Sequence, residues 1–114
     1  MSTTDQDTRG VRAAKNQSLF RDINERVQQI NETFSVILKT GDWVCECADL
    51  ECTERIELTA DEYELVRSYG DRFIVARGHI YPDVERLVGD TNGYWVVEKI
   101  EDAAEVARRL DPRA

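Results

Sequence analysis

All three cysteines of this 114-residue chain lie within eight positions, in the stretch "WVCECADLECTERIEL". An odd number of cysteines cannot form a closed set of disulfides. Residues 1–15, "MSTTDQDTRGVRAAK", contain no apolar run typical of a signal peptide, and no segment reaches the roughly 18 apolar residues of a transmembrane helix. We therefore expect a cytoplasmic protein that does not bind membranes and whose thiols stay reduced. Clustered reduced thiols predict a metal site, and a metal site would constrain the fold around it.

The single histidine of the chain, His79, follows Cys52 after 26 intervening residues. Three thiolates and one imidazole are an established tetrahedral ligand set for zinc. We therefore predict a structural zinc ion with four ligands: Cys45, Cys47, Cys52 and His79. The Cys-x-Cys spacing is tighter than the two to four intervening residues usual in such sites, so we expect the backbone to turn between Cys45 and Cys47.

Other interpretations of the cysteine cluster stay open. Free cysteine often packs as a small buried hydrophobic residue, and three of them in one segment could do only that. An iron–sulfur cluster usually needs four thiolates, and a redox pair usually has two residues between its cysteines. A thiophilic ion other than zinc would also suit the four predicted ligands.

An apolar stripe in residues 18–34 predicts a helix. Its members recur at alternating spacings of three and four: Phe20, Ile23, Val27, Ile30 and Phe34. We expect this helix to begin near Asn16 or Ser18 and to pack its stripe against a sheet of the same domain. The alternative is a coiled-coil seam, which the stripe satisfies for barely two heptads. Residues 1–15 lack periodicity and predict a flexible N-terminal tail.

Short strands and helices fill the rest of the chain. The apolar residues 36–38 predict the end of a helix that runs into a strand. Thr59 and Glu62 have the spacing of a helix-starting capping box. We expect strands near 43–44, 55–59, 72–78 and 94–99, and helices near 59–70, 82–89 and 101–110. The sequence thus predicts one small α+β domain over residues 16–114, with short strands, three to four helices and a zinc-stapled knuckle.

The balance of charges bears on the class of partner. The formal net charge of −8, from 23 acidic and 15 basic side chains, repels nucleic-acid phosphates, so we do not expect a nucleic-acid partner. Four arginines lie near the predicted site in sequence: Arg67, Arg72, Arg77 and Arg86. They form either a local basic patch or ion pairs with the surplus carboxylates.

Catalytic patterns are weak in this sequence. The only histidine is already a predicted metal ligand, and the six glycines are scattered rather than gathered into a phosphate-binding loop. We therefore expect no enzyme, but a protein-interaction or regulatory module with an unknown protein partner and a structural zinc. The first alternative is a thiol- or zinc-based sensor of redox state or metal, and the second is a nucleic-acid-binding regulator.

Several motifs together resemble those of a family. They are the Cys-x-Cys-x4-Cys segment, the helix start "LTADEYE", Gly78-His79 after a strand, and "VVEK" near the end. This combination, with "FRDINERV" in the first helix, resembles a family of short uncharacterised bacterial proteins, largely actinobacterial, over about residues 18–111. The resemblance implies that His79 belongs with the three cysteines, and it implies no known activity.

Overall fold

The computed structural model describes residues 5–34, 41–91 and 93–113 of the chain. In this part the chain forms three helices and five strands. In chain order they are α1 (Asp5–Phe34), β1 (Gly41–Val44), β2 (Arg55–Leu58), α2 (Ala60–Arg67), β3 (Arg72–Val75), β4 (Glu85–Thr91), β5 (Tyr94–Lys99) and α3 (Glu101–Arg109). The predicted small α+β domain is confirmed. The predicted strand and helix end at residues 36–38 lie outside the described residues.

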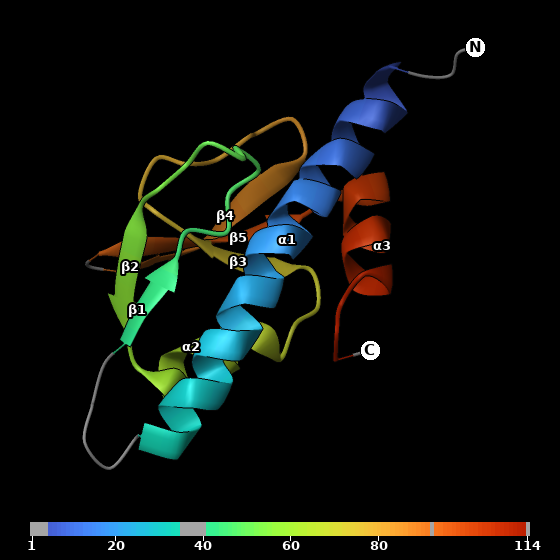
Figure 1. Cartoon of the computed structure of the whole chain (residues 1–114). Helices are drawn as coiled ribbons and strands as arrows, with labels where there is room; N and C mark the ends of the chain where they lie inside the picture. Colours follow the sequence, from blue (N-terminus) through green and yellow to red (C-terminus); the bar gives the residue numbers. More distant parts are fainter. Residues whose placement is uncertain (1–4, 35–40, 92, 114) are drawn as a thin grey trace.

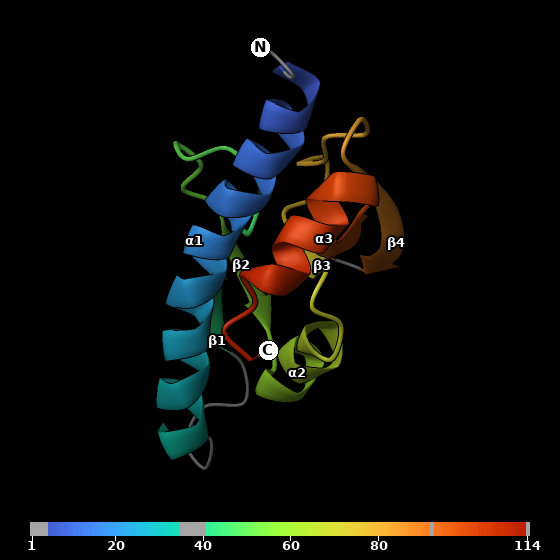
Figure 2. The same cartoon turned by 90° about the vertical axis from the view of Figure 1, so that its right-hand side faces the viewer.

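The strands form two antiparallel sheets. One is the hairpin β1–β2, in which Trp43 pairs with Ile56, and the other has the order β3-β5-β4. The long helix α1 runs along one side of the molecule past both sheets, with α3 beside it and α2 near its C-terminal half (Figures 1 and 2). The segment between β1 and β2 and the loop after β3 therefore face each other between the two sheets.

The core lies between α1 and the sheets. Trp43 of β1 stacks on Tyr63 of α2 with ring centroids 4.2 Å apart, and its indole N–H donates to the carbonyl of Leu58. Phe73 and Ile74 of β3 and Val97 of β5 are fully buried beside them. Because large apolar side chains from both sheets share this core, the two sheets form one folding unit.

Helix α1 departs from the prediction in two ways. It begins at Asp5, so residues 5–15 are its first turns rather than a tail outside the domain. The side that faces the core is mostly small or polar: Gly10, Ala13, Ala14, Gln17, Arg21, Asn24 and Gln28. The predicted apolar stripe is not the buried one, because Ile23 is 47% and Ile30 57% exposed, although Val27 still packs at the edge of the core.

The buried polar residues of α1 are accommodated because they bond to distant parts of the chain. Asn24 donates to the carbonyl of Val44 and accepts from its N–H, both at 2.8 Å. Gln17 donates to the carboxylate of Glu85, which forms a buried ion pair with Lys99 at 2.8 Å. Partners of this kind are far away in sequence, so the periodicity of apolar residues does not reveal them.

The predicted helix at residues 82–89 is wrong. This segment contributes strand β4, which pairs with β5 through a bulge between Leu87 and Gly89. Pro82 lies in the turn before the strand, so its role as a helix start does not apply. The predicted capping box of Thr59 and Glu62 is confirmed, since it starts α2. The predicted helix near residues 101–110 is α3, in which Ala103, Val106 and Ala107 are buried, whereas Leu110 just after it is 41% exposed.

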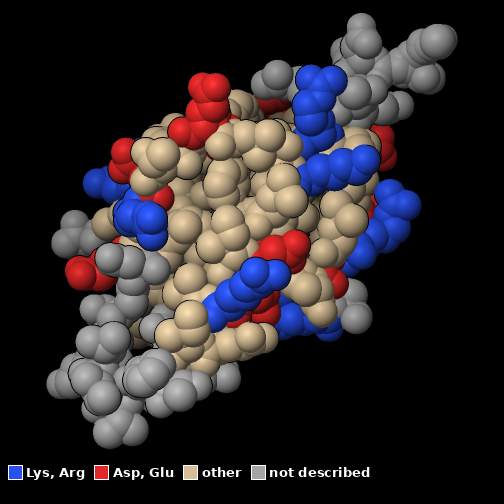
Figure 3. All heavy atoms as spheres, in the orientation of Figure 1, with Lys and Arg blue, Asp and Glu red and all other residues tan. Residues whose placement is uncertain are grey.

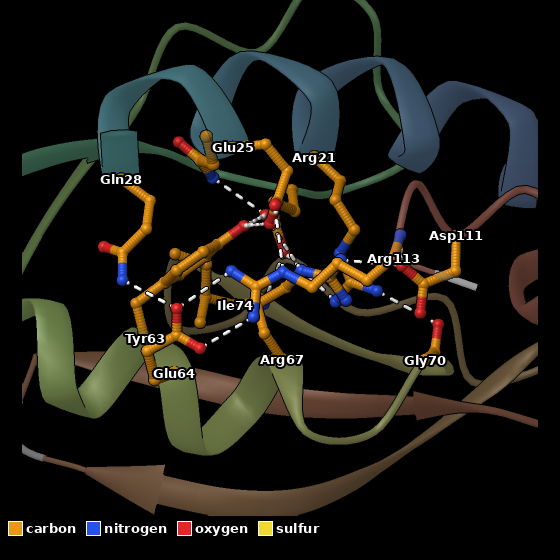
Figure 4. A network of polar contacts seen from close by, with 12 residues as sticks. Arg21, Glu25, Gln28, Tyr63, Glu64, Arg67, Gly70, Ile74, Asp111 and Arg113 are labelled. Carbon is orange, nitrogen blue, oxygen red and sulfur yellow. Dashed lines mark hydrogen bonds and ion pairs between the residues drawn. The ribbon is translucent and has the colours of Figure 1, made fainter. Parts of the chain in front are cut away.

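The C-terminal residues after α3 are tied to α1 and α2 by ion pairs (Figure 4). Arg113 donates to the carboxylates of Glu64 and Glu25 at 2.7–2.9 Å. The buried guanidinium of Arg67 contacts Glu25 and Asp111, each at 2.6 Å. These contacts join the C-terminal residues to both α1 and α2.

The same contacts predict a dependence of stability on pH. The hydrogen bond from Arg113 lowers the pKa of Glu64 below its ordinary 4.5. A lowered folded-state pKa contributes stability above the unfolded pKa, and this contribution is lost as the pH falls through the folded-state value. We expect Arg113→Ala to lower the melting temperature at pH 7 by a few degrees, as exposed pairs contribute little. The difference from the wild type should shrink once the pH falls below about 4.5.

Thermal melts followed by circular dichroism across this pH range measure the effect. Arg109→Ala is the matched control, because Arg109 is an exposed arginine of α3 for which no ion pair with a described residue is seen. A difference between Arg113→Ala and wild type that stays constant down to pH 3 would contradict the assignment to these carboxylates.

Candidate metal centre

The structure brings all four predicted ligands together. Cys45 and Cys47 follow the end of β1, Cys52 precedes β2, and His79 lies in the loop after β3. Their donor atoms, three Sγ and one ring nitrogen, all lie within 4.8 Å of one another. The Nδ1 atom of His79 is 3.6 Å from Sγ of both Cys45 and Cys52. Residues from the two sheets thus converge on one point.

The spacing of the donor atoms can be compared with that of a tetrahedral zinc site. Zinc–sulfur bonds of about 2.3 Å and zinc–nitrogen bonds of about 2.0–2.1 Å, at tetrahedral angles, place sulfur and nitrogen about 3.6 Å apart. The two measured sulfur–nitrogen distances are 3.6 Å. The arrangement is therefore compatible with a zinc ion held by the four residues. No disulfide links the cysteines.

The backbone around the first two cysteines bridges the two sheets. The N–H of Cys45 donates to the carbonyl of Glu54, beside β2, and the N–H of Glu46 donates to the carbonyl of Ile74 in β3. Successive amides thus point in opposite directions, as in a strand, and alternate side chains share a face. Cys45 and Cys47 can therefore reach one metal without the turn that we expected between them.

The loop that carries His79 is also fixed by hydrogen bonds. The N–H of His79 donates to the carbonyl of Ala76 at 2.9 Å, which closes a turn through Gly78. Gly78 has a φ of 90°, a conformation that side chains other than glycine's rarely adopt. The N–H of Ala76 donates to Sγ of Cys45 at 3.1 Å. One short loop therefore supplies a ligand and a hydrogen bond that stabilises charge on another ligand.

Electrostatics in the cluster favour a cation. A hydrogen bond from the Cys45 thiol lowers the pKa of Cys47 to about 5, and the same bond raises the pKa of Cys45. In the absence of a metal ion, close thiols share their protons in this way, because neighbouring thiolates repel each other. A divalent ion would offset that repulsion and hold all three sulfurs as thiolates. Cys45 and Cys47 are only 1% exposed, whereas Cys52 and His79 are half-buried.

Sequence reasoning missed the most deeply buried acid of the site, Glu46, which lies between two ligands. Its side chain is fully buried on the side away from the cysteines. It accepts hydrogen bonds from the N–H of Ile74, the amide of Asn24 and the hydroxyl of Tyr63. Arg21 completes the surroundings at 3.7 Å. In the sequence, Glu46 is one acid among several near the cysteines, so no local signal distinguishes it.

A surface pocket of about 280 Å³ adjoins the centre. It is lined by residues of the two segments that carry the ligands: Cys47, Asp49, Gly78, His79, Ile80 and Tyr81. The centre thus has one side close to solvent, whereas its other side is packed against the core.

The four arginines near the site form ion pairs rather than a free basic patch. Arg67 pairs with Glu25 and Asp111, and Arg77 with Asp90. Arg72 and Arg86 share Glu98, which lowers the pKa of that carboxyl. Their charges are therefore largely neutralised within the domain.

Among the described residues, no helix is both long enough and apolar enough to cross a membrane. The chain matches no protein-family model, no curated protein and no solved structure.

Proposed function

We propose that the protein is a cytoplasmic zinc-binding module in which Cys45, Cys47, Cys52 and His79 hold a structural zinc ion, and that it acts by binding another protein. The observation that supports the zinc site is the convergence of four donor atoms within 4.8 Å, from the β1–β2 connection and the loop after β3. Zinc bound there would join the two sheets and make the folded domain dependent on the metal.

The donor set supports a structural metal over a catalytic one. Catalytic zinc usually has three protein ligands and a fourth position for water or substrate, whereas structural zinc has four protein ligands. Here four donors from the protein are within reach, and two of the thiols are almost fully buried. A water molecule activated by the metal has no place in such a set, so we propose no catalytic role.

The metal content of the purified protein tests the proposal. Mass spectrometry of the protein prepared without added metal should find about one zinc per chain, and thiol titration should detect the three cysteines only after a strong chelator is added. No stoichiometric metal, together with three freely titratable thiols, would overturn the proposal. If stoichiometric iron or copper were found instead, the four-ligand site would be supported and zinc would be the wrong metal.

A second candidate function is a thiol sensor, which is favoured by the partial exposure of one ligand, Cys52. Cys52 is half-buried, so a peroxide could oxidise it more readily than Cys45 or Cys47. Fast zinc release by micromolar hydrogen peroxide, with an accompanying change in partner binding, would favour the sensor. Slow release would favour the structural module.

A further inference from the structure

Helix α1 has its apolar side turned away from the domain. Leu19, Ile23 and Ile30 are 56%, 47% and 57% exposed. At about 100° per residue their directions fall within about 40° of one another, so they form one stripe, which we call the outer stripe. The buried polar residues Gln17, Arg21, Asn24 and Gln28 point to nearly the opposite side. In the usual amphipathic helix the apolar stripe faces the core and the polar side faces solvent, so α1 has the reverse arrangement.

The outer stripe is accessible along the helix. In Figure 2, α1 forms the left side of the molecule, and the other helices lie to its right. Of the part of the chain that the structure describes, only the segment between β1 and β2 extends past α1 on the left, beside its N-terminal half. Figure 3 looks onto the helix from outside and shows a face made mostly of uncharged residues over its middle. Among the described residues nothing covers Leu19, Ile23 or Ile30, and exposed apolar side chains gathered on one face of a helix mark interaction sites.

The charges beside the outer stripe indicate what covers it. Asp22 and Arg26 are both exposed and lie on the same flank of the stripe, one turn apart. In an antiparallel pair of helices, equal flanks meet. Antiparallel pairing of two α1 helices about residues 24–25 therefore places Asp22 of each chain near Arg26 of the other. The same alignment places Leu19 of one helix against Ile30 of the other.

Parallel pairing lacks this match. In a parallel pair the Asp22–Arg26 flank of one helix meets the opposite flank of its partner, where Phe20 and Val27 lie. Both charges would then face apolar side chains. We propose that two copies of this chain form an antiparallel dimer through the outer stripe of α1, with Asp22 of each chain paired to Arg26 of the other.

The dimer does not require the metal centre, because the outer stripe lies on α1 and none of its residues contributes a metal ligand. The apolar contact from Leu19 to Ile30 spans only about 17 Å of helix. Stable interfaces usually cover about 800 Å² per partner. A contact of this length covers a smaller area than that, so we expect a dissociation constant in the micromolar range.

Sedimentation velocity of the full-length, metal-loaded protein over a range of concentrations tests the proposal. The wild type should pass from monomer to dimer, and Ile23→Glu should raise the dissociation constant by at least about tenfold. Leu65→Glu is the matched control, because Leu65 is 72% exposed on α2, away from the stripe, and its variant should dimerise normally. Circular dichroism verifies that each variant is folded.

A charge exchange tests the alignment. Asp22→Arg and Arg26→Asp should each weaken self-association, because each places like charges opposite one another in the antiparallel pair. An equimolar mixture of the two variants should restore a dimer, since every Asp then meets an Arg of the other chain. A wild type that stays monomeric at every concentration, a dimer that Ile23→Glu leaves unchanged, or a mixture without restored association would each overturn the proposal.

Discussion

Replacing Cys45 by serine is expected to abolish stoichiometric zinc binding and to remove the cooperative thermal transition of the domain. Structural zinc contributes about 10–16 kcal/mol of apparent binding free energy in small peptides at neutral pH, whereas a whole domain is stable by only about 5–15 kcal/mol. Cys45 is a buried candidate ligand, and its sulfur also accepts the N–H of Ala76. Loss of this ligand therefore affects both sheets that meet at the metal.

Metal analysis and differential scanning calorimetry of the same samples measure this result. Thr53→Ser is the matched control, because Thr53 is exposed in the same segment between β1 and β2 and supplies no donor atom to the cluster. A Cys45→Ser variant that keeps one zinc per chain and melts at the wild-type temperature would show that the metal does not stabilise the fold through Cys45.

Replacing Glu46 by alanine is expected to lower the free energy of unfolding by about 3–5 kcal/mol, even with zinc bound. The change leaves the buried guanidinium of Arg21 without its counter-charge and leaves the hydroxyl of Tyr63 without an acceptor in Glu46. Removing one partner of a buried ion pair is strongly destabilising, because the remaining charge stays buried and uncompensated. Urea denaturation of the zinc-loaded proteins measures the loss.

Two further variants separate the charge from the general effect of a substitution. Glu51→Ala, an exposed acid in the same segment, should change stability by less than about 0.5 kcal/mol. Arg21→Met added to Glu46→Ala should recover part of the loss, because no unpaired charge then remains in the core. Equal destabilisation by Glu46→Ala and Glu51→Ala would show that the buried network contributes little.

The candidate site could largely be predicted because its ligands belong to two residue types that commonly bind metal. Cysteine and histidine are the preferred ligands of zinc, and the chain contains no cysteine or histidine outside this set. Their grouping did not depend on knowing the fold. The capping box at Thr59 was predictable for a similar reason, since its two bonds join residues three positions apart.

The orientation of α1 could not be predicted from its apolar stripe. Its core-facing side includes polar side chains whose partners lie 20 to 68 positions away, as with Asn24 and Val44 or Gln17 and Glu85. Periodicity alone treats such residues as solvent-exposed. Strand β4 was missed because Pro82 and Gly89 are spaced like the start and the end of a short helix. Gly89 instead lies within β4, whose conformation is determined by pairing with β5.

X-ray absorption spectroscopy at the zinc edge of the purified protein tests the central claim most directly. We expect one zinc per chain, with three sulfur neighbours at about 2.3 Å and one nitrogen neighbour at about 2.0–2.1 Å. His79→Ala should remove the nitrogen neighbour or the zinc itself, since its Nδ1 lies 3.6 Å from two of the sulfurs. A protein without a zinc edge, or with zinc surrounded only by oxygen and nitrogen, would contradict the Cys₃His centre.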